Sequence, residues 1–477
     1  MQKLLNKFII LPIRDHLVSL IRYPDFRYIW LTGVFSFGGM WIFTVTATWI
    51  AVEESGSSRG PGIIAFSSLL PFLIFSAIGG FFADRYNRKN VVLATSFGNT
   101  ILAVLIAVGA VTDSLDLWHL AVGAFLAGGL RAVMEPAIQA LIPNQVDKKH
   151  MLNAITLNAL THHGSRFFGL LIASPLLASG VAISISGFTI IPGGIKTVLI
   201  LSAVFTALSA LSAMFCTTVS YGSITSKIQT SYITKEAKRS LFGINSRAME
   251  ISYGISYVVS GMLEGFRYIY THKIISIFII LVAFHCALVM SFESIMPIFS
   301  RETLKATDGS ILGYLVMAFG AGSIIGVLLV AGLNQEKHKG WVLLWSGVGS
   351  GITPILMALM QDSALAMLFA GFMGATQASF MAITNVYVLT VCPDRLRGRV
   401  SSLYVLHAGG IMAFANLGYG FLADLFNARV IFIITGLIFV VFLMAISTSL
   451  PKLRTCLLYT SDAADEGLGV DLGGRRI

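Results

Sequence analysis

The sequence predicts an all-α membrane protein of twelve transmembrane helices in two six-helix bundles, on three observations. Of the 477 residues, 56% are hydrophobic and only 12% are charged. Soluble domains carry about 25% charged residues, so a soluble protein this poor in charge would not cover its surface. The mean hydropathy is +0.81. Apolar runs of about 20 residues, long enough to cross a hydrocarbon core of roughly 30 Å, recur along the chain.

Six of these runs precede the middle of the chain and six follow it. The first six cover 28–52, 61–83, 91–111, 117–142, 152–177 and 196–216, and the second six cover 274–299, 311–333, 341–361, 364–391, 401–423 and 429–450. Between the two sets lies a polar stretch rich in Ser, Thr and Lys, followed by an amphipathic segment. We therefore expect an N-terminal bundle at 28–216, a cytoplasmic linker at 217–273 and a C-terminal bundle at 274–455.

The positions of Lys and Arg predict the orientation of the helices. The formal net charge is +10, but the cations stand in short clusters between apolar runs, which indicates membrane topology rather than a nucleic-acid partner. Clusters such as Lys148-Lys149 alternate along the chain with loops poor in cations. Because short cytoplasmic loops hold the Lys and Arg excess, both termini are expected in the cytoplasm of a multi-pass plasma membrane protein.

The two terminal segments are set apart from the bundles. Residues 1–27 mix apolar and cationic side chains without the features of a signal peptide, which favours an amphipathic helix on the cytoplasmic leaflet. Residues 456–477 have no apolar period and resemble the translation of a sequencing adapter, so we expect them to be an artefact. The four cysteines show no metal-ligand spacing, and no metal or other cofactor is expected.

The segment after the second run carries the most specific motif. It reads Gly79-Gly-Phe-Phe-Ala-Asp-Arg-Tyr-Asn-Arg-Lys89. Paired glycines allow close helix packing in a membrane, and Asn87 tolerates the tight turn that must follow. A simple cytoplasmic loop needs the positive charges but neither the glycines nor the embedded Asp84.

This segment resembles the signature loop of the major facilitator superfamily, G-x-x-A-D-R-x-G-R-K, which joins helices two and three. Asn87 replaces the usual glycine, and the matching residues are Gly80, Asp84, Arg85, Arg88 and Lys89. The resemblance implies that the loop gates the change between outward-open and inward-open states. It also implies that Asp84 faces the N-terminus of the eleventh span, where the helix dipole favours an anion.

Two further stretches, 24–31 and 393–403, resemble the enterobactin-exporter-like and macrolide-efflux-like branch of that superfamily. The second is a Pro-led polar loop between the fourth and fifth spans of its half, and it contains Asp394, Arg395, Arg397, Gly398 and Arg399. The resemblance covers about residues 20–450. It implies a monomeric secondary transporter whose partners are a small molecule, protons and the bilayer.

Four ionisable residues within the spans are candidates for proton coupling: Arg131, Glu135, Arg166 and Glu293. Such residues cost roughly 2.5–3.5 kcal/mol at a helix centre, so they mark function by default. Arg131 and Glu135 lie one turn apart, which suits either a self-neutralising pair or a proton site. Arg131 also matches the helix-four arginine that the family associates with proton coupling. Arg166 is a possible partner of Glu135 across helices, and Glu293 lies either at the outer rim or at a proton site.

Three isolated histidines, His162, His163 and His285, are interpreted as polar packing or solvent-exposed groups, although their titration range suits proton handling. Two functions stay open at this point. One is a proton-driven exporter of small amphipathic compounds such as drugs or siderophores, and the other is an importer or symporter of a small nutrient. A membrane-embedded enzyme would need a motif such as H-E-x-x-H, and an ATP-driven pump would need G-x-x-x-x-G-K-[ST]; the sequence contains neither.

Overall fold

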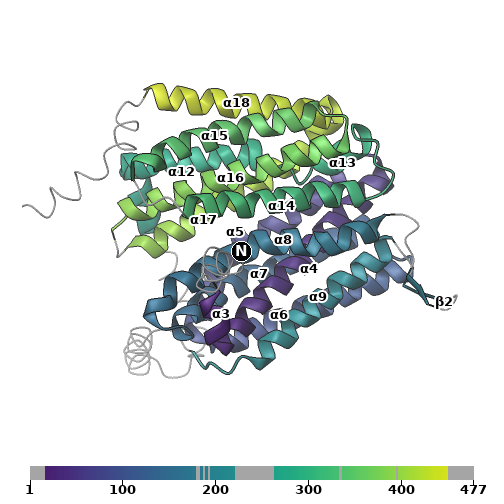
Figure 1. Cartoon of the computed structure of the whole chain (residues 1–477), viewed down its shortest axis with the longest axis horizontal. Helices are drawn as coiled ribbons and strands as arrows, with labels where there is room; N and C mark the ends of the chain where they lie inside the picture. Colours follow the sequence, from purple (N-terminus) through teal and green to yellow (C-terminus); the bar gives the residue numbers. More distant parts are fainter. Residues whose placement is uncertain are drawn as a thin grey trace, which may run out of the picture.

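The computed structural model describes residues 17–178, 183–185, 188–191, 194–220, 263–331, 336–393 and 396–449. Its helices form two groups that lie side by side, coloured purple to teal and green to yellow in Figure 1. The predicted adapter segment 456–477, and most of the predicted N-terminal amphipathic segment, lie outside the described residues.

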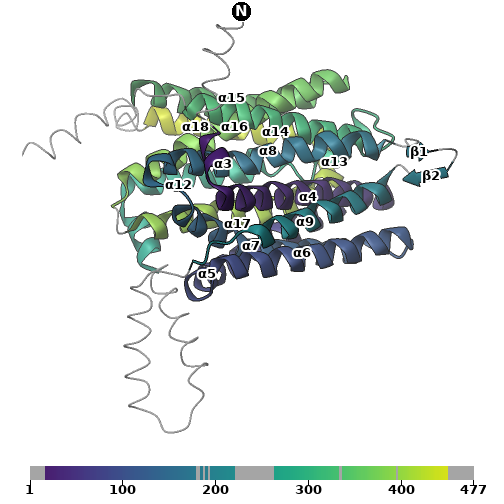
Figure 2. The same cartoon turned by 60° about the horizontal axis from the view of Figure 1, so that its bottom comes forward.

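The first group follows the chain from its start. It consists of α3 (Val18–Arg22), α4 (Pro24–Ser55), α5 (Arg59–Arg85), α6 (Arg88–Val111), α7 (Leu117–Leu141), α8 (Met151–Leu177) and α9 (Ile195–Phe215). Two short 3₁₀ turns, Ile142–Asn144 and Lys148–His150, join α7 to α8. An antiparallel hairpin of β1 (Ile183–Ile185) and β2 (Phe188–Ile191) lies between α8 and α9 and projects from one end of the helices (Figure 2).

The second group begins with helical residues 263–271. It continues with α12 (Lys273–His285), a π-helical turn η4 (Cys286–Met290), α13 (Met296–Glu302), α14 (Ser310–Ala331), α15 (Glu336–Leu359), α16 (Ser363–Val391), α17 (Arg397–Phe426) and α18 (Ala428–Ser449). Within the described residues, ten helices are long and apolar enough to cross a membrane. Helices α5 and α8 are not among these ten, although α5 contains a shorter apolar stretch, Arg59–Phe75. The chain is therefore a multi-pass, helical membrane protein.

Helix boundaries follow local capping chemistry. Pro24 stands at the first turn of α4, where its missing N–H costs nothing. The helix ends at Gly56, whose φ of 62° is favourable for glycine. The Asn87 side chain caps α6 by accepting from the Lys89 N–H, and Asp116 and His119 form a capping box on α7.

The seventh predicted run, 274–299, was wrong as a single helix. The α-helix stops at His285, passes through one π-turn and resumes only at Met296. Ser291 Oγ donates to the Cys286 carbonyl at 2.7 Å, so it competes with the helical bonding at this point. Neighbouring helices satisfy the freed backbone: Gln377 Nε2 donates to the Val289 carbonyl at 2.9 Å, and Asn416 Oδ1 accepts from the Ser294 N–H at 3.1 Å.

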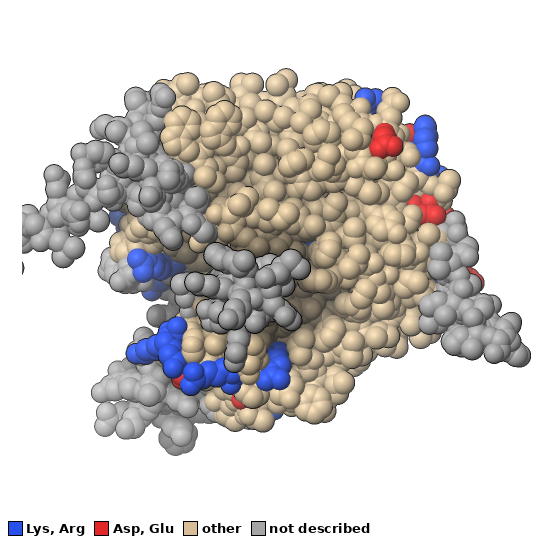
Figure 3. Space-filling model, viewed as in Figure 1, with Lys and Arg blue, Asp and Glu red and all other residues tan. Residues whose placement is uncertain are grey.

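The two groups meet mainly through α5 with α17 and α8 with α14. At the end that carries the hairpin, a buried apolar cluster draws residues from both groups, among them Trp49, Leu177, Phe299, Leu312 and Phe432. We call this the joined end. The other buried apolar clusters each belong to a single group. Figure 3 shows a hollow between the groups at the opposite, open end, with Lys and Arg gathered below it.

Candidate functional site

The signature loop lies at the open end, between the last turn of α5 and the first turn of α6. A Cβ added to Gly79 would lie 2.4 Å from the Ala132 carbonyl oxygen, so α5 and α7 pack closely only because this residue is glycine. This contact confirms the expected role of Gly79. The α5 backbone includes Gly80, Asp84 and Arg85, but their side chains lie outside the described part. Where Asp84 points therefore stays a prediction.

Arg88 in the signature loop anchors three parts of the first group. Its guanidinium donates to the Ala140 carbonyl at 2.9 Å and to Ser220 Oγ at 3.1 Å. Its backbone N–H donates to the Ser220 carbonyl at 2.9 Å. Arg88 thus ties the start of α6 to the end of α7 and to the segment after α9, while Lys89 contributes its N–H to the Asn87 cap.

The second-half loop also lies at the open end. Arg397 Nε donates to the Leu389 carbonyl near the end of α16 at 3.0 Å. Arg399 forms an ion pair with Glu264, which links α17 to helical residues 263–271. Gly398 lies within the first turn of α17, while Asp394 and Arg395 are outside the described residues.

Arg166 on α8 bridges the two groups. Its guanidinium carbon lies 3.6 Å from the Trp41 ring centroid on α4 and 4.7 Å from the Phe319 ring centroid on α14. The side chain is buried, and its Nε has no hydrogen-bond partner in the described part. The positive charge is therefore held mainly by two aromatic faces, one from each group.

The expected pair between Arg131 and Glu135 does not form. Arg131 is 6% exposed and turns toward α5, where it lies 3.5 Å from Ser68 Oγ and 5.3 Å from the Phe72 ring centroid. No ion pair joins it to Glu135 in the part of the chain that the structure describes. A spacing of four residues brings two side chains within reach, but here the neighbouring helix decides where the guanidinium goes.

Glu293 lies in the break between α12 and α13, deeper than the outer rim that was one alternative for it. It is within electrostatic reach of Arg166 and Arg131. The electrostatic partner of Arg166 is thus Glu293 rather than Glu135. The structure brings the four sequence candidates into one buried cluster, which we call the charge cluster: Arg131, Glu135, Arg166 and Glu293.

His162 borders the charge cluster from α8. Its ring is edge-on to Phe37 at 4.9 Å and to Trp41 at 6.3 Å between centroids. The side chain lies deep in the molecule and is nevertheless exposed, so it faces an internal space that solvent reaches. His285 differs: it is fully buried between Phe380 and Phe439, and neither ring nitrogen has a partner among the described residues.

Sequence reasoning missed Asp424, at the last turn of α17 and at the joined end. Its carboxylate accepts from Ser57 Oγ at 2.6 Å, from the Ser58 N–H at 2.8 Å and from Arg59 Nε at 2.8 Å. It therefore caps the N-terminus of α5, where a negative charge is favourable. One signal was present: Gly420-Phe-Leu-Ala-Asp424 repeats Gly80-Phe-Phe-Ala-Asp84, on the two helices that pack together.

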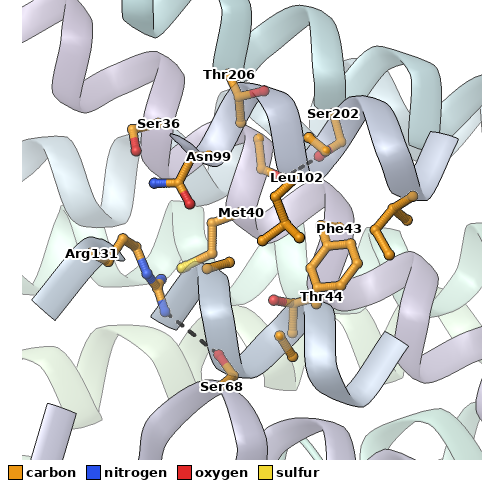
Figure 4. A pocket seen from close by; sticks show the side chains of 16 residues that line it. Ser36, Met40, Phe43, Thr44, Ser68, Asn99, Leu102, Arg131, Ser202 and Thr206 are labelled. Atoms are coloured by element: carbon orange, nitrogen blue, oxygen red, sulfur yellow. Dashed lines mark hydrogen bonds between the residues drawn. The ribbon is translucent and has the colours of Figure 1, made fainter. Parts of the chain in front are cut away.

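Helices α4, α5, α6, α7 and α9 enclose a cavity of about 50 Å³ inside the first group. Figure 4 shows Arg131, Ser68 and Asn99 on one side of it and Phe43 and Leu102 on the other. One water needs roughly 10–15 Å³ of such space, so the cavity holds a few water molecules. It is too small for a drug-sized ligand, which occupies about 300 Å³ or more.

Comparison with known proteins supports a transporter. The family described as transmembrane secretion effector matches residues 18–224 and 247–471. The multidrug efflux pump Tap of Mycolicibacterium fortuitum is 22% identical over 87% of this chain and 93% of its own length. The staphyloferrin B transporter of Staphylococcus aureus is 22% identical over 78% of this chain and 80% of its own length.

Solved structures share the fold. A bacterial homologue of the human lysosomal transporter Spinster, in an inward-facing and unoccupied conformation, superposes with a TM-score of 0.65 at 14% identity, over 92% of this chain and 98% of that one. The nucleoside transporter NupG gives a TM-score of 0.64 at 11% identity, over 88% and 98% of the two chains. With the family match covering most of the sequence, the chain belongs to the transmembrane secretion effector family of the major facilitator superfamily, and it is a transporter of small molecules.

Proposed function

We propose that this transporter is a proton-coupled exporter of small amphipathic compounds, of the drug or siderophore class. The two relatives named above are a multidrug efflux pump and a siderophore transporter. A proton gradient is the energy source that fits the sequence, because no phosphate-binding motif is present. The observation that carries the proposal is the charge cluster, buried where the two helix groups meet.

We further propose that the two groups are six-helix bundles with twelve spans in total and with both termini in the cytoplasm of the plasma membrane. In this topology the joined end faces outward and the hollow faces the cytoplasm, so the structure corresponds to an inward-facing state. Rocking of one bundle against the other would open the joined end and close the hollow. The protein is proposed to work as a monomer.

Proton coupling needs carboxylates whose protonation changes the balance of charge at the bundle interface. Glu135 and Glu293 suit this role, since neither carboxylate makes a hydrogen bond or ion pair in the described part of the chain. A proton on Glu293 would remove the negative charge that faces Arg166. Because Arg166 contacts both bundles through Trp41 and Phe319, that change acts directly on the contact that must break.

Gating is proposed to rest on one helix pair, α5 with α17, at both of its ends. At the joined end, Asp424 of α17 caps the start of α5. At the open end, Asp84 of α5 would cap the start of α17 in the outward-facing state, as the resemblance implies. The two carboxylates would then be engaged in alternate states.

A nutrient importer remains the second candidate. The structures that share the fold include transporters of nucleosides and peptides. At 11–14% identity, this likeness concerns the fold and supports no particular substrate.

Inside-out vesicles that contain the protein test the proposal. An imposed proton gradient, acidic inside, should drive accumulation of a fluorescent cationic dye or a ferric siderophore, and a protonophore should abolish it. Glu293→Gln should lose the gradient dependence. Glu302→Gln, which changes an exposed carboxylate on α13, is the matched control and should behave like the unmodified protein. Uptake that persists without a gradient would contradict proton coupling.

A further inference from the structure

A second cavity adjoins the one beside Arg131. It measures about 310 Å³ and lies between α6 and α7. The two cavities share three wall residues, Leu102, Ile106 and Gly123. They therefore form two chambers of one passage through the first helix group, separated at these residues.

The second cavity reaches the surface at the joined end. Its wall includes Thr112 and Ser114 in the loop between α6 and α7, and His119 in the first turn of α7. The adjacent Asp113 forms an ion pair with Lys196 at 2.7 Å, next to the hairpin that marks this end. In the proposed topology this mouth faces the outside.

The inner cavity contains polar groups that need water. The side chains of Ser36, Thr44 and Asn99 line it, and each is less than a tenth exposed. None of the three has a side-chain hydrogen bond within the described part of the protein, and Arg131 Nε has none either. Buried polar groups are almost always hydrogen-bonded, and the cavity has room for the few waters that would serve them.

The two chambers are pinched apart by an apolar constriction. A Cβ added to Gly123 would lie 3.1 Å from Ile106 Cδ1 and 3.9 Å from Phe43 Cζ. The space beside Gly123 is thus narrower than a water molecule needs. A small rotation of the Ile106 side chain would change its width.

We propose that this passage is a gated water path that carries protons from the outer face to the charge cluster, separately from the route of the substrate. The inference rests on the proton coupling proposed above. A proton would pass along waters beside Arg131 and bind to the Glu135 carboxylate, from which it later leaves to the hollow. Besides Glu135, the ionisable groups around Arg131 are Glu293 from the α12–α13 break and His162 from α8; α5 contributes the neutral Ser68 and Phe72.

The closed constriction is a requirement of this mechanism. The hollow between the bundles is open in the same structure. A continuous water path from the outer face would then let protons cross the membrane without any transport. The pinch at Gly123 and Ile106 prevents that leak while the transporter faces inward.

Two substitutions at the constriction should act in opposite directions. In proteoliposomes with an internal pH-sensitive dye and no substrate, Ile106→Ala should raise the rate of proton entry severalfold, because it widens the pinch. Gly123→Val should lower gradient-driven dye transport severalfold but leave dye exchange without a gradient intact, because the substrate route is untouched. Ile106→Ala in the Gly123→Val background should restore gradient-driven transport.

Leu126→Ala is the matched control, since Leu126 is 48% exposed on the outer face of α7 and should change neither measurement. If Ile106→Ala leaks no faster than this control, there is no path, and the inference is overturned. Loss of exchange along with gradient-driven transport in Gly123→Val would show a packing role instead. The leak assay needs no coupled transport. A faster leak in Ile106→Ala would therefore support the path even if gradient-driven export failed for the unmodified protein.

Discussion

Arg131 and Gln377 occupy equivalent places in the two halves of the molecule. Each stands at the same distance from the first residue of the fourth long helix of its half, α7 and α16, and each is buried. Gln377 donates to the Val289 carbonyl in the interrupted seventh run. Arg131 has only a long contact with Ser68 and otherwise faces a cavity.

The difference indicates a division of labour between the halves. In the second half, buried polar side chains such as Gln377 and Asn416 complete the hydrogen bonding of a broken helix. In the first half, buried polar groups around Arg131 are left to water and to the charge cluster. An unpaired charge in an apolar interior is costly, and that cost is best explained by a role in transport. The substitutions below test this comparison from either side.

Arg131→Gln should have the largest effect. It puts the neutral residue of the second half into the first, so the charge cluster loses a cation and gradient-driven transport falls by at least roughly tenfold, equivalent to about 1.4 kcal/mol. The amount of folded protein in the membrane should stay close to normal. Dye accumulation normalised to protein amount measures the effect, and full activity would remove Arg131 from the coupling mechanism.

Asp84→Asn extends the comparison to the gate of the first half. The substitution keeps the shape of the side chain but removes the charge that would cap α17, so transport should fall severalfold while insertion is unchanged. Turnover in vesicles with matched protein amounts is the measurement. Unchanged turnover would remove the gating assignment.

Asp424→Asn tests the corresponding carboxylate of the second half. It weakens three contacts to the start of α5, and a partly exposed charged contact of this kind contributes about 0.5–1 kcal/mol. The joined end should therefore open more often. A cysteine placed at Ser58, which is buried here, should then react a fewfold faster with an impermeant thiol reagent from the outer side. An equal rate with and without the substitution would contradict the gate.

Gln377→Leu should affect stability rather than coupling. It leaves the Val289 carbonyl without its partner, at a cost of about 1–3 kcal/mol. The melting temperature in detergent should fall, while the ratio of gradient-driven to gradient-free transport stays unchanged. A change in that ratio would break the proposed division between the halves.

His285→Leu should have the smallest effect. The histidine has two unpartnered nitrogens between aromatic rings, and a leucine of similar size removes that polar burial. We expect equal or slightly higher thermal stability and unchanged transport. A loss of proton coupling would show that the second half also contributes a titratable group.

Much of the helix layout and of the charge cluster was predictable from local sequence. The runs at 91–111, 117–142 and 196–216 coincide with α6, α7 and α9, because hydropathy and capping depend on neighbouring residues in the chain. Four ionisable residues within apolar runs were enough to select the cluster. The break in the seventh run escaped prediction, since it depends on Gln377 and Asn416 from helices far along the chain.

Pairing within the charge cluster was decided only in three dimensions. The spacing of Arg131 and Glu135 favoured a pair, but Ser68 and Phe72 on α5 turn the guanidinium away. Arg166 lies between Trp41 and Phe319, which are far apart in the sequence.

By itself the sequence determined that this chain is a helical membrane protein, that it resembles the major facilitator superfamily and which buried charges carry its chemistry. These features depend on composition and short spacings. The tertiary structure decided which charges face each other, which end of the molecule is closed and where a passage reaches Arg131. Those features depend on contacts between distant helices, whose side-chain directions are set by packing rather than by the local sequence.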